Sequence, residues 1–338
     1  MKKIKAAAAL AAVGVLALTG CGGGGSKASD DSSTINIVGY SVLDEANQGV
    51  EKGFQATEAG KGVKFKESYG ASGDQARAVA GGLKADEVHL SLEPDVQKLV
   101  DAGLVDSNWK DNSTNGDCSS SIVVFAVRKG NPKHIKTWAD LTKPGVGIVT
   151  PNPASSGSAK WNMLAAYGSI IADGGDETSA QAYMKKFFAN IASMPDSGRD
   201  ATTAFTGGTG DVLLSYENET ILARQKDPNQ MDYVIPDSSL KIENSCALLK
   251  DASAKAKAWL DFQKSKDGQK LYAETGYRPL VDIGKVTVKG AEDPSNPFPE
   301  PKKLLTIDDD FGGWTAANKK YFDENDGILT KLQADAGQ

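Results

Sequence analysis

The chain has 338 residues, of which 38 are Lys or Arg and 44 are Asp or Glu, so its formal net charge is −6. This length accommodates two domains or lobes. The sequence has no basic patch and no stretch of interleaved basic and aromatic residues, which excludes the usual electrostatic footprint of a nucleic-acid-binding protein.

The N-terminus has the pattern of a bacterial lipoprotein leader. Three lysines within the first five residues precede an apolar run at 6–18, which ends in Leu-Thr-Gly-Cys at 18–21. The run is too short to cross a hydrocarbon layer of about 30 Å as a helix, so a single transmembrane anchor is the weaker alternative. We expect residues 1–20 to be a signal peptide and Cys21 to be the acylated first residue of a mature protein of net charge about −9. Residues 21–34 then form a flexible linker at the extracytoplasmic face of the cell membrane.

Short β-branched runs alternate with helical patterns through the first third of the chain. The predicted strands are 35–40, 63–67 and 88–90, and the predicted helices are 45–57, 75–83 and 95–102. This repeated strand–helix pattern requires a mostly parallel sheet with helices on both faces. Such sheets bind ligands at the carboxyl ends of their strands.

A second strand–helix series predicts a second lobe. It comprises strands at 146–150 and 212–216 and helices at 159–172 and 180–189. The runs at 122–127 and 246–249 are predicted to be paired crossovers between the lobes, and further helices are expected at 254–264, 268–275 and near 316–332. We therefore predict an α/β fold of two lobes, each a mostly parallel sheet flanked by helices, with the ligand in the cleft between them. The expected divisions are 35–121 for the first part of lobe 1, 122–249 for the crossovers and lobe 2, and 250–338 for the second part of lobe 1 and the C-terminal helices.

The cysteines and histidines predict a disulfide and no metal site. Once Cys21 is acylated, Cys118 and Cys246 are left in an oxidising compartment, so we expect them to be bonded to each other. Two separate buried thiols remain the alternative. His89 falls in a predicted strand and His134 in a loop, and no His/Cys cluster has metal-ligand spacing, so neither a metal nor a cofactor is predicted.

Three loops of Ser and Gly open helical patterns, at 69–74, 150–161 and 196–200. In the second loop, Ser155 and Ser156 are expected to supply N-cap oxygens, and Gly157 allows the backbone to approach a ligand. The free N–H groups and the dipole of a helix N-terminus favour an anion. Three such helix starts, brought together by the fold, could surround a small tetrahedral oxyanion without Lys or Arg. For any single loop, an ordinary capped helix remains the simpler interpretation.

Several segments resemble one family, the prokaryotic sulfate/thiosulfate-binding proteins of ABC importers. The matching motifs are YGASGDQ at 69–75, VRKGNP at 127–132, KPG at 143–145, TPNPASSGSAKW at 150–161, DSG at 196–198, GDVLLSYENE at 210–219, GYRP at 276–279 and FGGW at 311–314. The resemblance extends from residue 35 to the C-terminus. It implies a periplasmic-binding-protein-like (type II) fold whose lobes close over a dehydrated sulfate held mainly by uncharged donors. It also implies delivery to a membrane permease by a receptor that we expect to be monomeric.

The resemblance also implies where the donors lie. Ser72 is expected to offer a hydroxyl and an N–H group, and N–H groups are expected from the helix start formed by Ser156, Gly157 and Ser158. Ser158 stands where the family often has Gly. One residue is missing after Gly198 relative to the family, so the donating amide among Gly198, Arg199 and Asp200 stays open.

Three more positions are assigned by the same resemblance. Arg199 is expected to brace its loop from outside the site. Tyr216 stands where sulfate receptors commonly have Trp, and a phenol can replace an indole as donor at a different reach. Ser41 stands where relatives often have Asp, and its hydroxyl could donate directly. These departures leave the ligand open between sulfate or thiosulfate and another oxyanion such as phosphate or molybdate.

Charge and motif spacing distinguish the alternative ligands and the alternative classes of function. Phosphate keeps a proton near neutral pH and needs an acceptor, so a site of donors alone favours sulfate. The carboxylates that could accept that proton, Asp74 and Asp200, are expected to be solvated helix caps. An extracytoplasmic serine hydrolase using Ser72 or Ser156 would need a histidine partner, but neither serine lies in a Gly-x-Ser-x-Gly motif. Glu217 and Glu219 are interpreted as a solvated helix start, and no enzyme is predicted. A purely structural envelope lipoprotein remains a third class.

Overall fold

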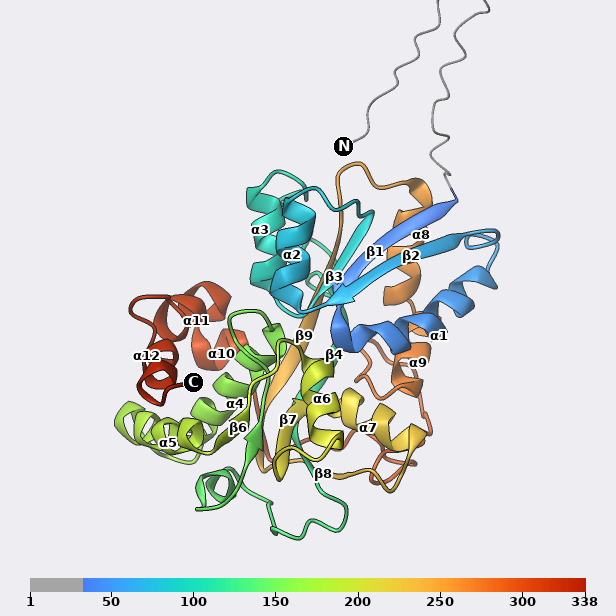
Figure 1. Ribbon diagram of the computed structural model, residues 1–338. Coiled ribbons are helices and arrows are strands. Elements are labelled where there is room, and N and C mark those ends of the chain that lie inside the picture. The colour runs from blue at the N-terminus through green and yellow to red at the C-terminus, as the bar shows by residue number, and fades with distance from the viewer. Residues whose placement is uncertain (1–32) are drawn as a thin grey trace, which may run out of the picture. The chain divides into compact units, whose positions relative to one another are not determined.

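The computed structural model of the protein describes residues 33–338, and the leader, Cys21 and nearly all of the expected linker lie outside this range. Ten strands form one mixed sheet in the order β2-β1-β3-β9-β4-β7-β5-β6, with β10 beside β9 and β8 beside β4. The parallel strands fall into two groups joined by β4 and β9, as expected for the type II two-lobe fold. Figure 1 shows β1, β2 and β3 at one end of this body and β6, β7 and β8 at the other.

Lobe 1 is built on three parallel strands whose side chains alternate between two helical layers. These strands are β1 (Thr34–Tyr40), β2 (Lys64–Gly70) and β3 (Glu87–Leu90). On one face, Val38 packs with α2 (Ser72–Ala80) and α3 (Glu93–Asp101). On the other face, Ile35 and Ile37 pack with α1 (Asp44–Gln55) and α8 (Ala254–Lys264). This period-two burial explains why β1 is apolar at adjoining positions.

Two long strands cross between the lobes and are stapled at one end. β4 (Asp117–Val127) pairs antiparallel with β9 (Ser238–Leu248), and β4 then continues beside β7 in lobe 2. The expected runs 122–127 and 246–249 lie in these two paired strands, but they do not pair with each other, because Ile122 lies opposite Lys241 and Cys246 lies opposite His89 of β3. Both strands begin earlier than expected because their first residues are buried polar side chains that sequence patterning does not score as strand. The predicted Cys118–Cys246 disulfide is confirmed, and it joins the start of β4 to β9.

Lobe 2 repeats the parallel arrangement. β5 (Ile148–Val149), β6 (Ile191–Ser193) and β7 (Val212–Tyr216) are parallel, while β8 (Asp232–Val234) and β7 are antiparallel to β4. The helices are α4 (Gly157–Ala172), α5 (Glu177–Ala189), α6 (Gly198–Thr206) and α7 (Glu217–Lys226), and two short 3-10 turns, η1 (Ser41–Leu43) and η2 (Trp138–Thr142), complete the lobes. Asp176 and Ser197 cap α5 and α6 with side-chain oxygens, which explains the boundaries of these two helices.

The C-terminal part contributes to both lobes. α8 and α9 (Lys266–Glu274) pack on α1, whereas α10 (Ile307–Phe311), α11 (Gly313–Tyr321) and α12 (Ile328–Asp335) follow β10 (Lys303–Leu305) and lie beside α4 and α5 (Figure 1). The single terminal helix expected near 316–332 is wrong. It is divided because the Asp323 side chain accepts hydrogen bonds from the amides of Asn325 and Asp326, which closes a turn before α12.

Candidate functional site

Three helix N-termini converge on one small cavity at the carboxyl ends of the strands. α2 follows β2, α4 follows β5 and α6 follows β6. The cavity has a volume of about 10 Å³ and is lined by Tyr40, Ser41, Val42, Ala71, Ser72, Ser91, Ser156, Gly157, Ser158 and Gly198. A Cβ added at Gly198 would lie 3.0 Å from Ser158 Oγ, so α6 and α4 touch at this point. The three loops of Ser and Gly are thus brought together as the sequence suggested.

The lobes are in direct contact around the cavity. The amide of Gly73, in lobe 1, donates to the carbonyl of Ser155, in lobe 2, over 3.0 Å. The amide of Arg199, in lobe 2, donates to Ser41 Oγ over 3.4 Å, and Ser41 lies just after β1 in lobe 1. Because Ser41 Oγ is an acceptor in this contact, its own hydrogen remains available to a group in the cavity.

Two of the three candidate amides at the start of α6 already have acceptors within the protein. The amide of Asp200 donates to the Ser197 hydroxyl over 3.1 Å, and that of Arg199 donates to Ser41. Gly198 is the residue of this loop that lines the cavity. The first N–H groups of a helix have no intrahelical acceptor, so the Gly198 amide is the one free to meet a ligand.

The Ser72 hydroxyl is turned away from the role expected for it. Ser72 Oγ donates to Asp95 Oδ2 over 2.7 Å and accepts from the amide of Ser91 over 3.0 Å. Asp95 is buried and also pairs with Lys98. Because its hydroxyl hydrogen is given to Asp95, Ser72 offers the cavity its N–H group at the start of α2.

The α4 start differs from the expected cap. Neither Ser155 nor Ser156 caps α4 through its side chain, because Ser155 Oγ donates to the carbonyl of Asp196 and Ser156 Oγ pairs with Ser158 Oγ over 2.8 Å. One of the two hydroxyl hydrogens forms the hydrogen bond between Ser156 and Ser158, so the other hydroxyl hydrogen is available to a group in the cavity. The amides of Gly157 and Ser158 lie in the first turn and have no intrahelical acceptor.

Two predicted site residues, Tyr216 and Arg199, lie behind the wall of the cavity. The Tyr216 hydroxyl is 2.6 Å from the hydroxyl of Ser91, and Ser91 itself lines the cavity. Sequence reasoning missed Ser91 because it sits in the run Leu-Ser-Leu after β3, without the Gly or Pro that marks the other loops.

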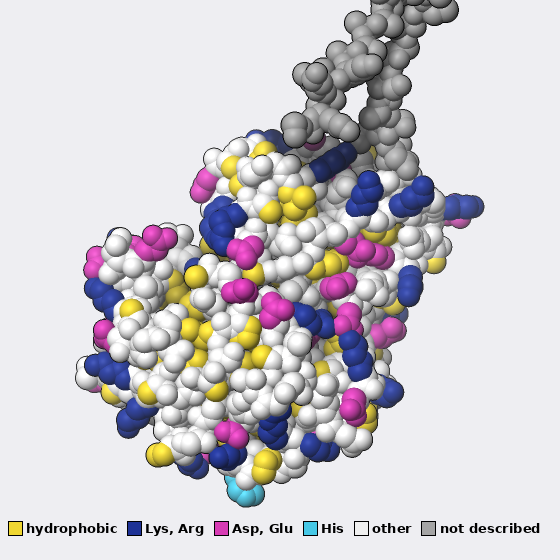
Figure 2. Space-filling model, in the orientation of Figure 1, with side chains coloured by type: hydrophobic (Ala, Val, Ile, Leu, Met, Phe, Trp, Pro, Cys, Tyr) yellow, Lys and Arg dark blue, Asp and Glu magenta, His cyan; other side chains and the backbone are white. Residues whose placement is uncertain are grey.

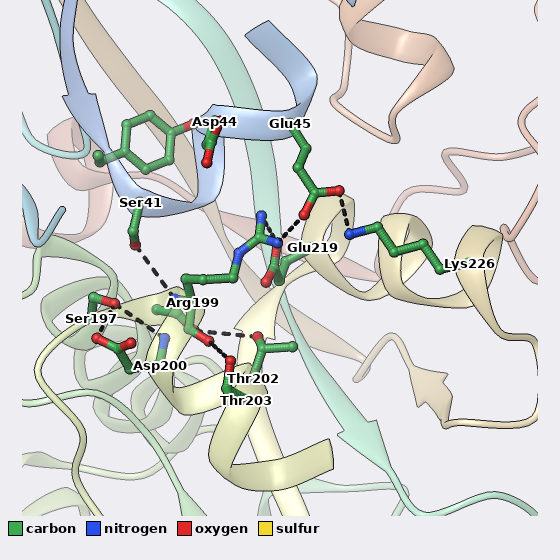
Figure 3. Close-up of polar contacts among 12 residues, drawn as sticks. Ser41, Asp44, Glu45, Ser197, Arg199, Asp200, Thr202, Thr203, Glu219 and Lys226 are labelled. Atoms are coloured by element: carbon green, nitrogen blue, oxygen red, sulfur yellow. Dashed lines mark hydrogen bonds and ion pairs between the residues drawn. The ribbon is translucent and has the colours of Figure 1, made fainter. Parts of the chain in front are cut away.

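Arg199 makes an ionic network outside the cavity, as expected of a bracing residue. Figure 3 shows its guanidinium pointing toward Glu45 of lobe 1 and Glu219 of lobe 2. The Arg199 Nη1–Glu45 Oε1 distance is 2.5 Å, the Arg199 Nη2–Glu219 Oε2 distance is 3.2 Å, and Lys226 also pairs with Glu45. Burial by itself would raise the pKa of Glu45, but hydrogen bonds from Lys226 and Arg199 outweigh burial and hold this pKa below its ordinary value.

The expectation that Glu217 and Glu219 form a solvated helix start is wrong, although they do begin α7. Both carboxylates are buried, with 0% and 2% of their surfaces exposed. Arg278 forms an ion pair with Glu217, with 2.6 Å between Nε and Oε2, and Arg199 forms an ion pair with Glu219. Burial raises the pKa of Glu219, and the Arg199 charge partly offsets this. Each carboxylate is buried because an arginine distant in sequence neutralises it.

The cavity wall is uncharged. Within residues 33–338, none of the residues lining it is Lys, Arg, His, Asp or Glu. Asp74 and Asp200, expected as solvated caps, are indeed exposed, and Asp74 pairs with Arg77. Figure 2 shows basic and acidic side chains interspersed on one face of the molecule, so no field of one sign dominates that face. An anion in the cavity would therefore be met by hydroxyl groups, amides and helix dipoles.

His89 and the cluster of Glu87, Cys118 and Cys246 have partners within the protein core. His89 Nε2 contacts Ser119 Oγ over 3.0 Å, and burial lowers the pKa of His89 to about 3. Glu87, Cys118 and Cys246 cluster within 4.8 Å, but both sulfurs are in the disulfide and the Glu87 carboxylate accepts from Trp259 and Gln263. These contacts give Glu87 and His89 structural partners in the core.

Comparison with known proteins agrees with this geometry. Residues 35–278 match the model of a family described as "Bacterial extracellular solute-binding protein". The chain belongs to this family. This solute-binding protein is 36% identical to the sulfate-binding protein of Synechococcus elongatus, over 98% of this chain and 96% of that one. It is 34% identical to the thiosulfate-binding protein of Pseudomonas aeruginosa, over 84% and 88% of the two chains.

The solved structure of the sulfate-binding protein SubI from Mycobacterium tuberculosis superposes on this solute-binding protein with a TM-score of 0.79. That structure is 41% identical in sequence, and the match covers 86% of this chain and all of the other. A periplasmic thiamin binding protein, at 14% identity and a TM-score of 0.69, shares the fold. Among the helices of residues 33–338, none has the length and apolar character needed to span a membrane.

Proposed function

We propose that this solute-binding protein captures sulfate, and also thiosulfate, in the uncharged cavity and delivers it to the permease of an ABC importer. The observation that carries this proposal is the meeting of three helix N-termini in one small cavity without a charged residue. Sulfate- and thiosulfate-binding relatives above 30% identity over most of the chain support the same ligand.

The proposed donors come from both lobes. Lobe 1 contributes the Ser41 hydroxyl and the Ser72 amide, and lobe 2 contributes the amides of Gly157, Ser158 and Gly198. One hydroxyl of the Ser156–Ser158 pair adds a further hydrogen. Because the donors of both lobes meet only when the lobes are together, an anion that contacts all of them favours the closed state through its differential affinity.

Sulfate is favoured over phosphate by the kinds of groups in the wall. Phosphate near neutral pH brings a proton that needs an acceptor, and a mismatch inside a closed cavity costs about 1–3 kcal/mol or more. The nearby carboxylates of Asp95 and Asp200 do not line the cavity, and each is directed to a serine hydroxyl, Asp95 to Ser72 and Asp200 to Ser197. Sulfate brings only acceptors, which match the donors.

Calorimetric titration of the purified protein, dialysed free of sulfate, tests this function. We expect one-to-one binding of sulfate with the same affinity at pH 7 and pH 5.5, competition by thiosulfate, and much weaker binding of phosphate, with molybdate titrated in parallel as a larger dianion. Binding of phosphate in preference to sulfate would show that an acceptor operates in the cavity. Absence of heat with all four anions would remove the receptor function while leaving the fold unchanged.

The proposal includes a lipid anchor and a receptor without catalytic activity. The motif that ends in Cys21 supports cleavage and acylation at that residue, and we infer that a monomer tethered at the extracytoplasmic face docks on the permease. Replacing Cys21 by Ser should move the protein from the membrane fraction to the soluble fraction and abolish labelling by radioactive palmitate. Retention of both in the variant would refute the anchor.

A further inference from the structure

Ser91 is a cavity residue whose backbone is fixed on both sides. Its amide donates to Ser72 Oγ over 3.0 Å, and its carbonyl accepts from Trp161 Nε1 over 3.0 Å and from Asn244 Nδ2 over 3.2 Å. A Cβ added at Gly157 would lie 2.5 Å from Ser91 Oγ, so this hydroxyl is directly against the first turn of α4. With the backbone fixed, only the orientation of the Ser91 hydroxyl remains adjustable.

Tyr216 controls that orientation from behind the wall. Its hydroxyl lies 2.6 Å from Ser91 Oγ. Burial raises the pKa of Tyr216 well above its ordinary value, so the phenol keeps its hydrogen. The distance allows either hydroxyl of the pair to donate, but a phenol is more acidic than an aliphatic alcohol and is therefore the stronger donor.

The difference in donor strength gives a short relay its direction. The Tyr216 hydroxyl gives its hydrogen to Ser91 Oγ, which leaves the Ser91 hydrogen for a group in the cavity that Ser91 lines. We propose that Ser91 is a ligand-binding residue that donates its hydroxyl hydrogen to the bound oxyanion, and that Tyr216 is the positioning residue that orients this donor. This inference rests on the proposed function and adds one donor to the same site.

Sulfate titration of three variants, two controls and the parent tests the relay. Ser91→Ala is expected to weaken sulfate binding roughly tenfold or more, since it removes a hydrogen bond to a charged group. Tyr216→Phe should weaken it by a smaller factor, and the double variant should bind no more than about twofold more weakly than Ser91→Ala, because both changes interrupt one path. The matched controls are Ser169→Ala and Tyr183→Phe, whose buried hydroxyls donate to the carbonyls of Ala166 and Trp138 away from the cavity.

The outcomes separate this inference from the proposed function. Sulfate binding by Ser91→Ala at the parent affinity, or losses that multiply in the double variant, would overturn the relay while leaving the receptor function intact. A parent protein that does not bind sulfate would overturn both. Thermal unfolding of each variant and control shows whether a loss of affinity follows from a loss of folding. If Ser91→Ala does not fold, Tyr216→Phe decides alone, and an unchanged affinity in it refutes the positioning role.

Discussion

Replacing Arg199 by Met should destabilise the protein because it leaves the Glu219 carboxylate buried without its arginine. The Arg199–Glu219 ion pair spans 3.2 Å, and Glu219 is 2% exposed. At this distance, and with an effective dielectric constant of about 20, the attraction is about 5 kcal/mol. Arg199 is 28% exposed, so solvent screens part of the attraction, and we expect a net loss of about 3 kcal/mol in the free energy of unfolding.

Two further variants separate orphaned charge from lost packing. Glu45→Gln removes the partly exposed partner of Arg199 and should cost about 1 kcal/mol or less. The double variant Arg199→Met, Glu219→Gln has no unpaired carboxylate at this place. Most of the 3 kcal/mol of unfolding free energy lost in Arg199→Met should therefore be regained. Urea unfolding at pH 7, followed by intrinsic fluorescence, measures all three values. A double variant no more stable than Arg199→Met alone would refute the charge argument.

The same variant should show a characteristic pH dependence. Burial raises the pKa of Glu219 in the folded protein above its unfolded value, and loss of Arg199 raises it further. A carboxyl whose folded pKa is raised contributes stability below its unfolded pKa of about 4.3 and loses it as pH rises through the folded pKa. The deficit of Arg199→Met relative to the parent should therefore shrink between pH 7 and pH 5. A constant deficit across this range would contradict the mechanism.

Three other changes test separate parts of the structure. Replacing Cys118 and Cys246 by Ala removes a disulfide that closes a loop with a sequence separation of 128, and it should lower the free energy of unfolding by up to about 5 kcal/mol. Denaturation of the parent with and without reductant measures this loss, and identical unfolding midpoints under the two conditions would exclude the bond. Burial and a hydrogen bond to Glu67 raise the pKa of Glu51 to about 9, so Glu51→Gln should stabilise the protein at pH 8 and have little effect at pH 4, as thermal melts would show. Gly157→Ala places a Cβ 2.5 Å from Ser91 Oγ and should weaken sulfate binding at least tenfold; an unchanged affinity would show that the cavity is not the binding site.

The strand–helix order and the convergence of the three loops were predictable because both depend on local pattern. β-branched runs mark the strands, and the Ser and Gly residues after β2, β5 and β6 mark the helix starts. Since the carboxyl ends of parallel strands meet at one edge, the topology alone brings these loops together. The lengths of the strands were less predictable where buried polar residues such as Ser119 and Ser121 extend β4.

The direction of individual hydrogen bonds was not predictable from the sequence. Ser72 donates to Asp95, which is 23 residues away, and Glu217 is neutralised by Arg278, which is 61 residues away. Local patterns treat each of these side chains as solvent-facing or ligand-facing, because they contain no information about distant partners. Ser91 has no Gly or Pro beside it to mark its loop, and the hydroxyl that it contacts, that of Tyr216, lies 125 residues later.

The separation of charges from donors explains how an acidic protein can hold a dianion. Arg199 and Lys226 are placed outside the cavity and are already neutralised by Glu45 and Glu219, so they add little net field inside. The wall instead presents hydroxyls and first-turn amides, whose positions are fixed by the helices and do not depend on pH. First-turn amides can only donate, and with no carboxylate in the wall they favour the anion that has no proton to place. This is the basis on which the site distinguishes sulfate from phosphate in the proposed function.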